Sequence, residues 1–294
     1  MASIHEQPRV ILWSVPRSCT TAVLRSISNL VERGEIYYEP YYKALVGGPE
    51  SESASTPAPR ATAILPSAGS AYDSSIFTYA WVKKTLEAEH KDASLVFVKD
   101  FAMSLAGKVY MDHLPHGYRH TFLIRNPNKV IPSWRKCHDE WRPSKPLLDE
   151  EAKEEWHKAD MGEHAGFKDL LELYQYVREN LDPAPFVMDA DDLVSQPETV
   201  MAAYCKATGI PFSRKLIEWE NDGSPMYAKW ITCRDHLGYL NCNYHTNARS
   251  SSGFRKNEDL PKPASTSVTN PKAIEQIAKC VPYYEKLYRE RFVP

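Results

Sequence analysis

Residues 17–21 place a guanidinium, three hydroxyl groups and a thiol in one short stretch: Arg17, Ser18, Cys19, Thr20 and Thr21. The guanidinium carries a permanent charge and a planar fork of N–H donors that matches the oxygens of a phosphate or sulfate. If a helix begins here, its first backbone N–H groups favour an anion at the same place. The stretch therefore predicts an anion-binding loop.

The residues around this loop have the patterns of a buried strand and of a helix. Residues 10–13, Val-Ile-Leu-Trp, form an apolar run typical of a strand covered on both faces of a parallel sheet. Downstream, apolar residues recur at helical spacing at Val23, Leu24 and Ile27. The loop lacks the Gly-x-x-x-x-Gly-Lys-Ser/Thr pattern of common nucleoside triphosphatases. An ordinary strand–turn–helix with a hydroxyl cap is therefore the alternative.

A second stretch with suitable chemistry follows the apolar residues 121–124. Arg125 begins the sequence Arg-Asn-Pro, and Ser133 comes eight residues later in an expected helix. An arginine at the end of a strand can bind phosphate with two N–H groups, while a hydroxyl from the next helix donates from the other side. These two residues predict further phosphate contacts.

Glu39 and Lys99 are the other charged residues at expected strand ends. Glu39 follows the apolar segment 35–38 and precedes a proline, which favours an extended backbone at Glu39. Lys99 follows the buried strand expected at residues 94–98. Because ligands bind at the carboxyl ends of the strands in open α/β sheets, we expect both side chains near Arg17. A solvated loop carboxylate and a solvated strand-end lysine are the alternatives.

Strands and helices alternate along the chain, which predicts an α/β fold: a three-layer sandwich with a central, mostly parallel sheet of five strands. The strands are expected at residues 10–13, 35–38, 94–98, 121–124 and 185–189. At 294 residues, a single domain covering 1–294 is sufficient. Within it we expect a mobile loop at 47–71, a helical insertion at 137–180 and a turn-rich cap at 221–270.

Composition argues against several classes of partner. The formal net charge of −2 and the absence of a five-residue run of Lys and Arg argue against nucleic acid. The first strand is expected within about ten residues, too early for a secretory signal, and no apolar run nears the roughly 20 residues of a membrane span. We therefore expect a cytoplasmic protein with no membrane partner.

Metal and disulfide chemistry have little support in the sequence. The six cysteines include no Cys-x-x-Cys pair, which argues against a zinc site and a disulfide framework. His157 and His164 are seven residues apart and could share a helix face, but no third ligand accompanies them. We expect no metal.

Three stretches resemble motifs of the sulfotransferase family, whose members use 3′-phosphoadenosine 5′-phosphosulfate (PAPS) as sulfuryl donor. Residues 16–21 resemble the Pro-Lys/Arg-Ser-Gly-Thr-Thr loop that holds the 5′-phosphosulfate. Arg125 with Ser133 resembles the family's 3′-phosphate motif. Residues 254–256, Phe-Arg-Lys, resemble a late loop that closes over that phosphate. Cys19 replaces the family's glycine, which makes a left-handed backbone there less expected.

The resemblance implies a P-loop-like nucleotide-binding fold and in-line transfer of a sulfuryl group from PAPS to a hydroxyl or amine, without a metal. It adds Arg255 and Lys256 to the donor-binding residues, and it gives Arg17 and Lys99 the task of neutralising the leaving phosphate. Cytosolic animal members place a histidine two residues after the matching lysine. That position here is Phe101, so we expect Glu39 to take the acceptor's proton.

Two other functions stay open. A small-molecule kinase could use the same fold, although the missing Gly-Lys-Ser/Thr weakens this reading. A nucleotide-binding protein without catalysis could keep Arg125 and Ser133 and lack the acid–base group. The small-molecule acceptor is not identified: some aromatic residues suit an apolar or aromatic compound, but core packing explains them equally well. These are Trp81, Trp134, Trp141 and Tyr227.

Overall fold

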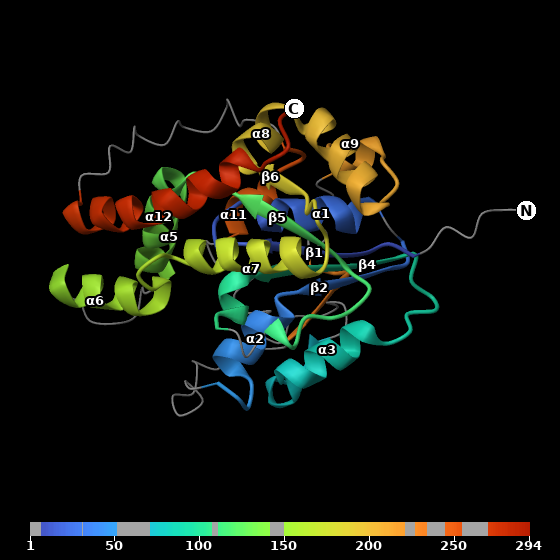
Figure 1. The fold of residues 1–294 in the computed structure, drawn as a ribbon, viewed down its shortest axis with the longest axis horizontal. Coiled ribbons are helices and arrows are strands. Elements are labelled where there is room, and N and C mark those ends of the chain that lie inside the picture. Colours follow the sequence, from blue (N-terminus) through green and yellow to red (C-terminus); the bar gives the residue numbers. More distant parts are fainter. Residues whose placement is uncertain are drawn as a thin grey trace, which may run out of the picture.

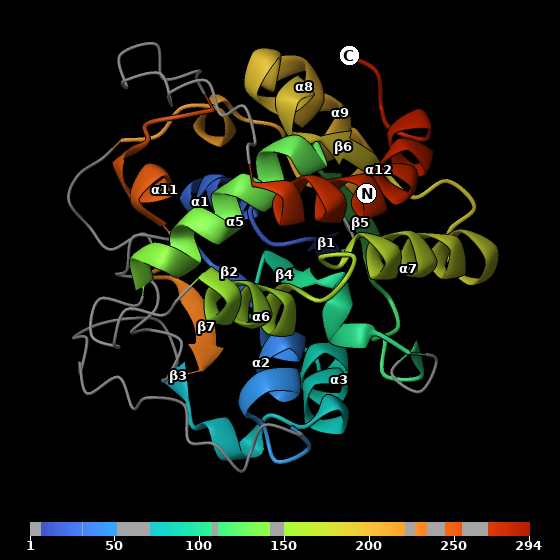
Figure 2. The same cartoon turned by 90° about the vertical axis from the view of Figure 1, so that its left-hand side faces the viewer.

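A computed structural model describes the chain at residues 7–30, 32–51, 71–107, 111–141, 150–220, 227–233, 245–254 and 270–294. Across these residues, seven strands form one sheet in the order β3-β7-β2-β4-β1-β5-β6 (Figure 1, Figure 2). Every pair of neighbouring strands runs parallel. The strands are β1 (Arg9–Ser14), β2 (Gly34–Tyr38), β3 (Ala71–Tyr72), β4 (Leu95–Phe101), β5 (Arg119–Ile124), β6 (Val187–Asp189) and β7 (Trp230–Cys233).

The expected count of five strands is wrong. The five expected strands are present as β1, β2, β4, β5 and β6, and they are joined by β7 and the two-residue β3 at one edge of the sheet, at the lower left of Figure 2. Both extra strands are short: β7 has four residues and β3 has two. The sequence did not indicate them because β3 borders the Gly-, Pro-, Ser- and Ala-rich segment 47–71 and β7 lies in the turn-rich segment 221–270, so neither has a clear apolar run.

Helices connect the strands and cover both faces of the sheet. The α-helices are α1 (Thr20–Leu30), α2 (Pro40–Gly47), α3 (Tyr79–Glu87), α5 (Pro127–Trp141), α6 (Glu150–Met161), α7 (Phe167–Asn180), α8 (Ala190–Ser195), α9 (Pro197–Thr208), α11 (Thr246–Ser250) and α12 (Pro271–Arg289). Single 3₁₀ turns are η2 (Ser74–Ile76), η3 (Ala102–Leu105) and η4 (Arg214–Leu216).

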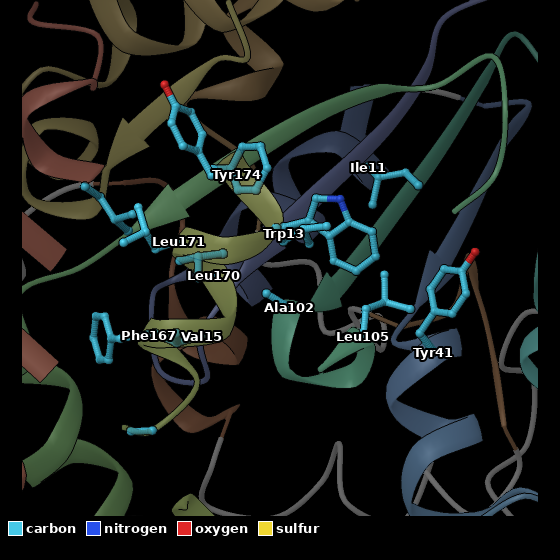
Figure 3. Packing of buried hydrophobic residues seen from close by; sticks show 14 of the residues in the cluster. Ile11, Trp13, Val15, Tyr41, Ala102, Leu105, Phe167, Leu170, Leu171 and Tyr174 are labelled. Atoms are coloured by element: carbon cyan, nitrogen blue, oxygen red, sulfur yellow. The ribbon is translucent and has the colours of Figure 1, made fainter. Parts of the chain in front are cut away.

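Alternate residues of β1 enter two different cores, as the two-residue period of a strand requires. Ile11 and Trp13 belong to a core cluster with α2, α3, α5, α7 and α12. Val10 and Leu12 belong to a second cluster with α1, α8 and α9. Figure 3 shows part of the first cluster, where Trp13 lies among side chains from α2, η3 and α7. The sheet is therefore the middle of three layers.

The segments expected to lie outside the regular sheet have mixed outcomes. The described part of the region 137–180 is helical apart from the turn at 162–166, and α7 packs into the first core cluster beside β5. Residues 52–70 of the expected mobile loop lie outside the described residues, as does most of the region 221–270. The description as one domain stays a prediction.

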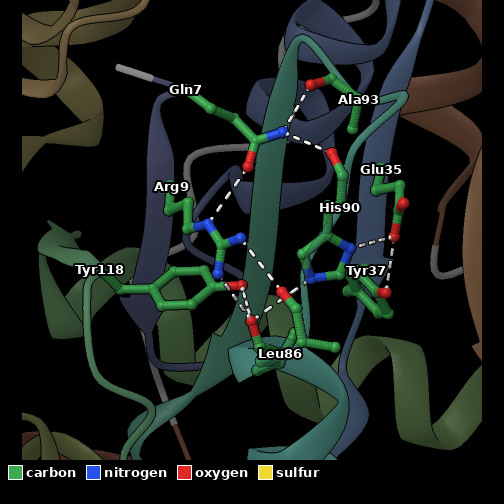
Figure 4. Close-up of polar contacts among 9 residues, drawn as sticks. Gln7, Arg9, Glu35, Tyr37, Leu86, His90, Ala93 and Tyr118 are labelled. Atoms are coloured by element: carbon green, nitrogen blue, oxygen red, sulfur yellow. Dashed lines mark hydrogen bonds and ion pairs between the residues drawn. The ribbon is translucent and has the colours of Figure 1, made fainter.

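A polar network joins the amino-terminal ends of the strands (Figure 4). The carboxylate of Glu35 lies 2.8 Å from His90 Nδ1 and accepts a hydrogen bond of 2.8 Å from the hydroxyl of Tyr37. The amide of Gln7 donates to the backbone carbonyls of His90 and Ala93. Burial and the bond to Glu35 raise the pKa of Tyr37. These contacts fix β1, β2 and the approach to β4 at the end of the sheet remote from the carboxyl ends of the strands.

Successive residues of β4 serve opposite faces of the sheet at its other end. Lys99 and Asp100 are both buried, and Asp100 turns toward α2. Its carboxylate accepts the backbone N–H groups of Tyr41, at 2.6 Å, and Tyr42, at 3.1 Å, in the first turn of α2. It also accepts the N–H of Phe101 at 2.8 Å. Asp100 therefore caps α2 from a neighbouring strand.

We predict that Asp100→Asn flattens the pH dependence of stability. Burial raises the pKa of Asp100 to about 7, although the N–H donors pull it down. In the unfolded chain its pKa is about 3.9, so the folded protein binds this proton more tightly. The free energy of unfolding should therefore fall as pH rises from about 4 to about 7, by up to about 4 kcal/mol.

Urea unfolding at several pH values tests this prediction, with the exposed Asp92→Asn as the matched control. The wild type and Asp92→Asn should lose stability across this window, while Asp100→Asn should lose less. Because asparagine replaces one acceptor oxygen of the cap by a donor, the variant should also be less stable at low pH. Equal slopes for Asp100→Asn and the wild type would contradict the assignment.

Candidate functional site

The loop between β1 and α1 folds with two residues in the left-handed region. Arg17 has φ 67° and Cys19 has φ 64°. The expectation that cysteine in place of glycine disfavours this conformation is wrong at Cys19. Its carbonyl accepts the N–H groups of Ala22, at 3.0 Å, and Val23, at 3.3 Å, which forms the first turn of α1. These bonds offset a left-handed penalty of about 1–2 kcal/mol.

The hydroxyl residues of this loop meet at the start of α1. Thr20 is the first residue of the helix and is buried, and Thr21 follows half-buried. Ser18 is fully buried, and within the described part of the chain its Oγ has no hydrogen-bond partner. A buried hydroxyl beside the free N–H groups of a helix start is the arrangement expected of a site that takes an anion.

Arg125 and Ser133 both contact the loop, although they lie more than 100 residues away in the sequence. Arg125 follows β5, and its Nη1 donates to the backbone carbonyl of Arg17 at 2.6 Å. The Nε of Arg17 in turn donates to Ser133 Oγ, in α5, at 3.1 Å. The Nε of Arg125 has no partner among the described residues. The structure thus brings the two predicted phosphate motifs together at the carboxyl ends of β1 and β5.

Lys99 and Glu39 form a buried ion pair. Lys99 lies within β4, paired in register with Leu12 and Tyr38, so it is not the solvated strand-end lysine of the alternative interpretation. Its side chain is 1% exposed, and its ammonium contacts the carboxylate of Glu39 directly. The ammonium also lies 3.7 Å from the ring centroid of Phe101. Burial lowers the pKa of Lys99, and the carboxylate of Glu39 opposes that shift.

The expected extended backbone at Glu39 is wrong. Glu39 has φ 55° and ψ 48°, in the left-handed region, directly before Pro40. Its N–H donates to the carbonyl of Lys99 at 2.8 Å, and its carbonyl accepts the N–H of Lys43 at 3.0 Å. Glu39 occupies the N-cap position of α2 without capping it, because Asp100 accepts those N–H groups instead. The left-handed turn therefore allows the Glu39 carboxylate to pair with the Lys99 ammonium.

His245 is a member of the site that the sequence did not indicate. Its Nε2 lies 3.5 Å from the hydroxyl of Tyr38, whose ring centroid is 5.1 Å from the Lys99 ammonium. Burial, together with the positive charges of Lys99, Arg17 and Arg249, lowers the pKa of His245 to about 3. The imidazole is therefore neutral at physiological pH. No spacing or motif links it to Tyr38, which is 207 residues earlier.

The segment that carries His245 is tied to α1. Arg25, buried in α1, donates from Nη1 to the backbone carbonyls of Ala248 and Arg249 in α11. The Arg25 guanidinium also lies 5.8 Å from the ring centroid of Trp219. Because α1 begins at the anion-binding loop, these bonds hold α11 and the preceding His245 beside that loop.

The structure also bears on other residues and sites expected from the sequence. Trp134 and Tyr227 are buried in the two core clusters, which favours packing over an acceptor pocket. Phe254 is buried against Trp219, whereas Arg255 and Lys256 lie outside the described residues. In the described part of the chain, no three His, Cys, Asp or Glu side chains are grouped to hold a metal ion. None of the described helices combines the length and apolar character needed to cross a membrane.

Comparisons of sequence give two partial relatives, and no protein-family model matches the chain. Branched-chain-amino-acid aminotransferase-like protein 2 of Arabidopsis thaliana is 30% identical over 112 residues, which are 38% of this chain and 16% of that protein. Branched-chain-amino-acid aminotransferase-like protein 1 of the same plant is 23% identical over 260 residues, 87% of this chain and 38% of that protein. The chain spans less than two fifths of the length of either relative.

Comparisons of structure extend over nearly the whole chain. The sulfotransferase domain from the curacin biosynthetic pathway matches with a TM-score of 0.53 and 12% identity, covering 98% of this chain and 99% of that one. The sulfotransferase domain from the Synechococcus PCC 7002 olefin synthase matches with a TM-score of 0.54 and 13% identity, covering 100% and 99%. At these identities the likeness concerns the fold alone. The chain shares its fold with sulfotransferase domains.

Proposed function

We propose that the chain is a sulfotransferase that moves a sulfuryl group from PAPS to a hydroxyl or amine of a small-molecule acceptor. The main support is the contact between the two phosphate motifs: Arg125 donates to the loop, and Arg17 donates to Ser133, beside the start of α1. Ser18 Oγ and Arg125 Nε, which have no hydrogen-bond partner among the described residues, support an anionic ligand there. The shared fold with sulfotransferase domains supports the sulfuryl group over other anions.

The aminotransferase in the names of the plant relatives is not carried over to this chain. The matched part is at most 38% of those proteins, and the fold over nearly the full chain is that of sulfotransferase domains. Those names therefore do not determine the activity of this part.

In this proposal the loop and the cations act on the donor. The N–H groups at the start of α1, with Ser18, Thr20 and Thr21, bind the 5′-phosphosulfate, and Arg125 and Ser133 bind the 3′-phosphate. Arg17 and Lys99 stabilise the negative charge that grows on the leaving phosphate as the S–O bond breaks. Transfer then depends on positioning and charge neutralisation, as in phosphoryl transfer.

Glu39 has a task in this proposal that its sequence position did not suggest. Desolvation of Lys99 favours the neutral amine, and the adjacent carboxylate keeps the ammonium charged. Its role as proton acceptor stays a prediction, and the ion pair supports the role of holding Lys99 in its charged form.

A direct test of the proposed function incubates the protein with PAPS and a panel of phenols, alcohols and amines, and measures release of 3′-phosphoadenosine 5′-phosphate. Thermal-shift titration with that product, with AMP and with ATP runs alongside, because a ligand that binds the native state raises Tm. Release with one acceptor class, and a larger shift for the 3′-phosphorylated nucleotide, supports the proposal. The absence of both product release and a thermal shift would overturn the proposal.

The first prediction from the proposed function concerns the 3′-phosphate. Arg125→Ala should remove most of the preference for 3′-phosphoadenosine 5′-phosphate over AMP, roughly a ten- to a hundredfold loss in affinity for the former, because a charge-assisted bond is worth about 1.5–3 kcal/mol. Calorimetric titration measures both ligands. Arg119→Ala, an exposed arginine at the far end of β5, is the matched control. Equal binding of both nucleotides by the wild type would contradict a 3′-phosphate pocket.

The second prediction concerns Lys99. Lys99→Met keeps the length of the side chain but removes the charge, so the single-turnover transfer rate at saturating donor should fall by roughly 10²–10³ while nucleotide affinity changes little. Because this leaves the buried Glu39 carboxylate unpaired, the double variant Lys99→Met/Glu39→Gln should recover stability but not rate. An unchanged rate in the double variant would make Lys99 a structural residue.

The third prediction separates the two roles of Glu39. In Glu39→Gln the pKa of Lys99 should fall further, because desolvation is no longer opposed by the carboxylate. Activity should then be lost as pH rises through the new, lower pKa of Lys99, so the alkaline limb of the rate profile moves to lower pH. Rate profiles from pH 5 to 10 measure this. A loss of roughly 10² at every pH, with the alkaline limb unmoved, would instead assign the proton to Glu39.

A further inference from the structure

We propose that His245 is the catalytic base that takes the acceptor's proton. This inference rests on the proposed sulfuryl transfer and names a residue of that same site. It is carried by the position of an uncharged imidazole among the cations that would hold the donor.

The position of His245 is set from two sides. Its Nε2 contacts the hydroxyl of Tyr38 at 3.5 Å, and the ring planes of the two residues meet edge to face with centroids 6.4 Å apart. The Tyr38 ring is itself stacked on Trp230 of β7, 5.0 Å between centroids. From the other side, Arg25 fixes α11 to α1 through two backbone carbonyls. The imidazole is thus held at the carboxyl end of β2, beside Lys99.

Access favours His245 over Glu39 as the base. The Glu39 side chain is 6% exposed, and one of its oxygens contacts the Lys99 ammonium directly. A carboxylate in such a pair is a weak base, because taking a proton would leave the buried ammonium without its counter-charge. His245 is only half-buried and can meet an acceptor molecule.

The cations around His245 make its pKa depend on whether the donor is bound. The charged groups that act on His245 are Lys99 of β4, Arg17 of the loop after β1 and Arg249 of α11, and its uncharged neighbour is Tyr38 of β2. Glu39 is already paired with Lys99. In this cationic setting the imidazole holds no proton, and its lowered pKa makes it a weak base in the free protein. A bound polyanionic donor adds negative charge beside Lys99 and Arg17, which raises the pKa of His245 and strengthens it as a base.

The proposed transfer forms one bond to sulfur and breaks another. The acceptor oxygen forms a bond to sulfur while the bond between sulfur and the bridging phosphate oxygen breaks. The electron pair of that bond stays on the phosphate, beside Arg17 and Lys99. The hydroxyl proton passes to the imidazole of His245, and then to water after the sulfated product leaves. No oxidant, reductant or metal is needed for this sequence.

The kinetic test compares His245→Gln with His116→Gln, an exposed histidine paired with Glu87 and remote from the site. With the fastest acceptor of the panel, His245→Gln should lower the single-turnover rate by roughly 10² or more. Its affinity for 3′-phosphoadenosine 5′-phosphate should stay within about threefold. Free imidazole should restore part of the rate in His245→Ala, which a purely structural role would not allow.

A second measurement needs no acceptor. In NMR titrations of the full chain, the imidazole signal that is missing in His245→Gln should show no titration above pH 5 in the free protein. With 3′-phosphoadenosine 5′-phosphate bound, its midpoint should rise by about one pH unit or more. An unmoved midpoint in the bound protein would overturn the electrostatic part of the inference.

The outcomes separate this inference from the proposed function. Failure of the nucleotide to bind would overturn the proposed function, and His245 as base with it. Binding and transfer by the wild type, with His245→Gln within threefold of it, would overturn the inference alone.

Discussion

The charge of Lys99, buried within β4, is the constraint on which the arrangement of the site depends. A buried ammonium without a partner costs many kcal/mol, so a carboxylate has to reach it. Glu39 does so only from a left-handed turn at the end of β2. That turn uses the N-cap position of α2, and the helix start is then capped by Asp100 from β4. Two successive residues of β4 thus have different tasks: Lys99 places a charge on one face of the sheet, and Asp100 caps α2 on the other.

Backbone strain is concentrated at the same edge of the sheet. Four non-glycine residues in the described part of the chain have positive φ, and three of them are Arg17, Cys19 and Glu39. Each costs on the order of 1–2 kcal/mol. The strain persists because the first turn of α1 and the start of α2 are built on the same residues. The starts of α1 and α2 therefore hold Arg17 and Glu39, which carry opposite charges, in backbone conformations that are unfavourable in an isolated chain.

The sequence was sufficient for the regular framework and for the residues attached to it. The apolar run of β1, the helix after it and the Arg125–Ser133 segment carry strong local patterns, and all of them meet where strand order predicts. The conformations of Cys19 and Glu39 were not predictable, because tertiary hydrogen bonds override the local preferences for glycine and for an extended residue before proline. His245 was not predictable either, since its place depends on a long-range contact between Arg25 and backbone carbonyls.

That contact has an evolutionary consequence. Arg25 holds α11 through the main-chain carbonyl oxygens of Ala248 and Arg249, which every amino acid supplies. The attachment therefore places no demand on which side chains α11 carries. Across descendants of this chain, side chains of α11 can change without loss of this attachment. Such substitutions would alter the surface beside the anion-binding loop, with the donor-binding framework inherited unaltered.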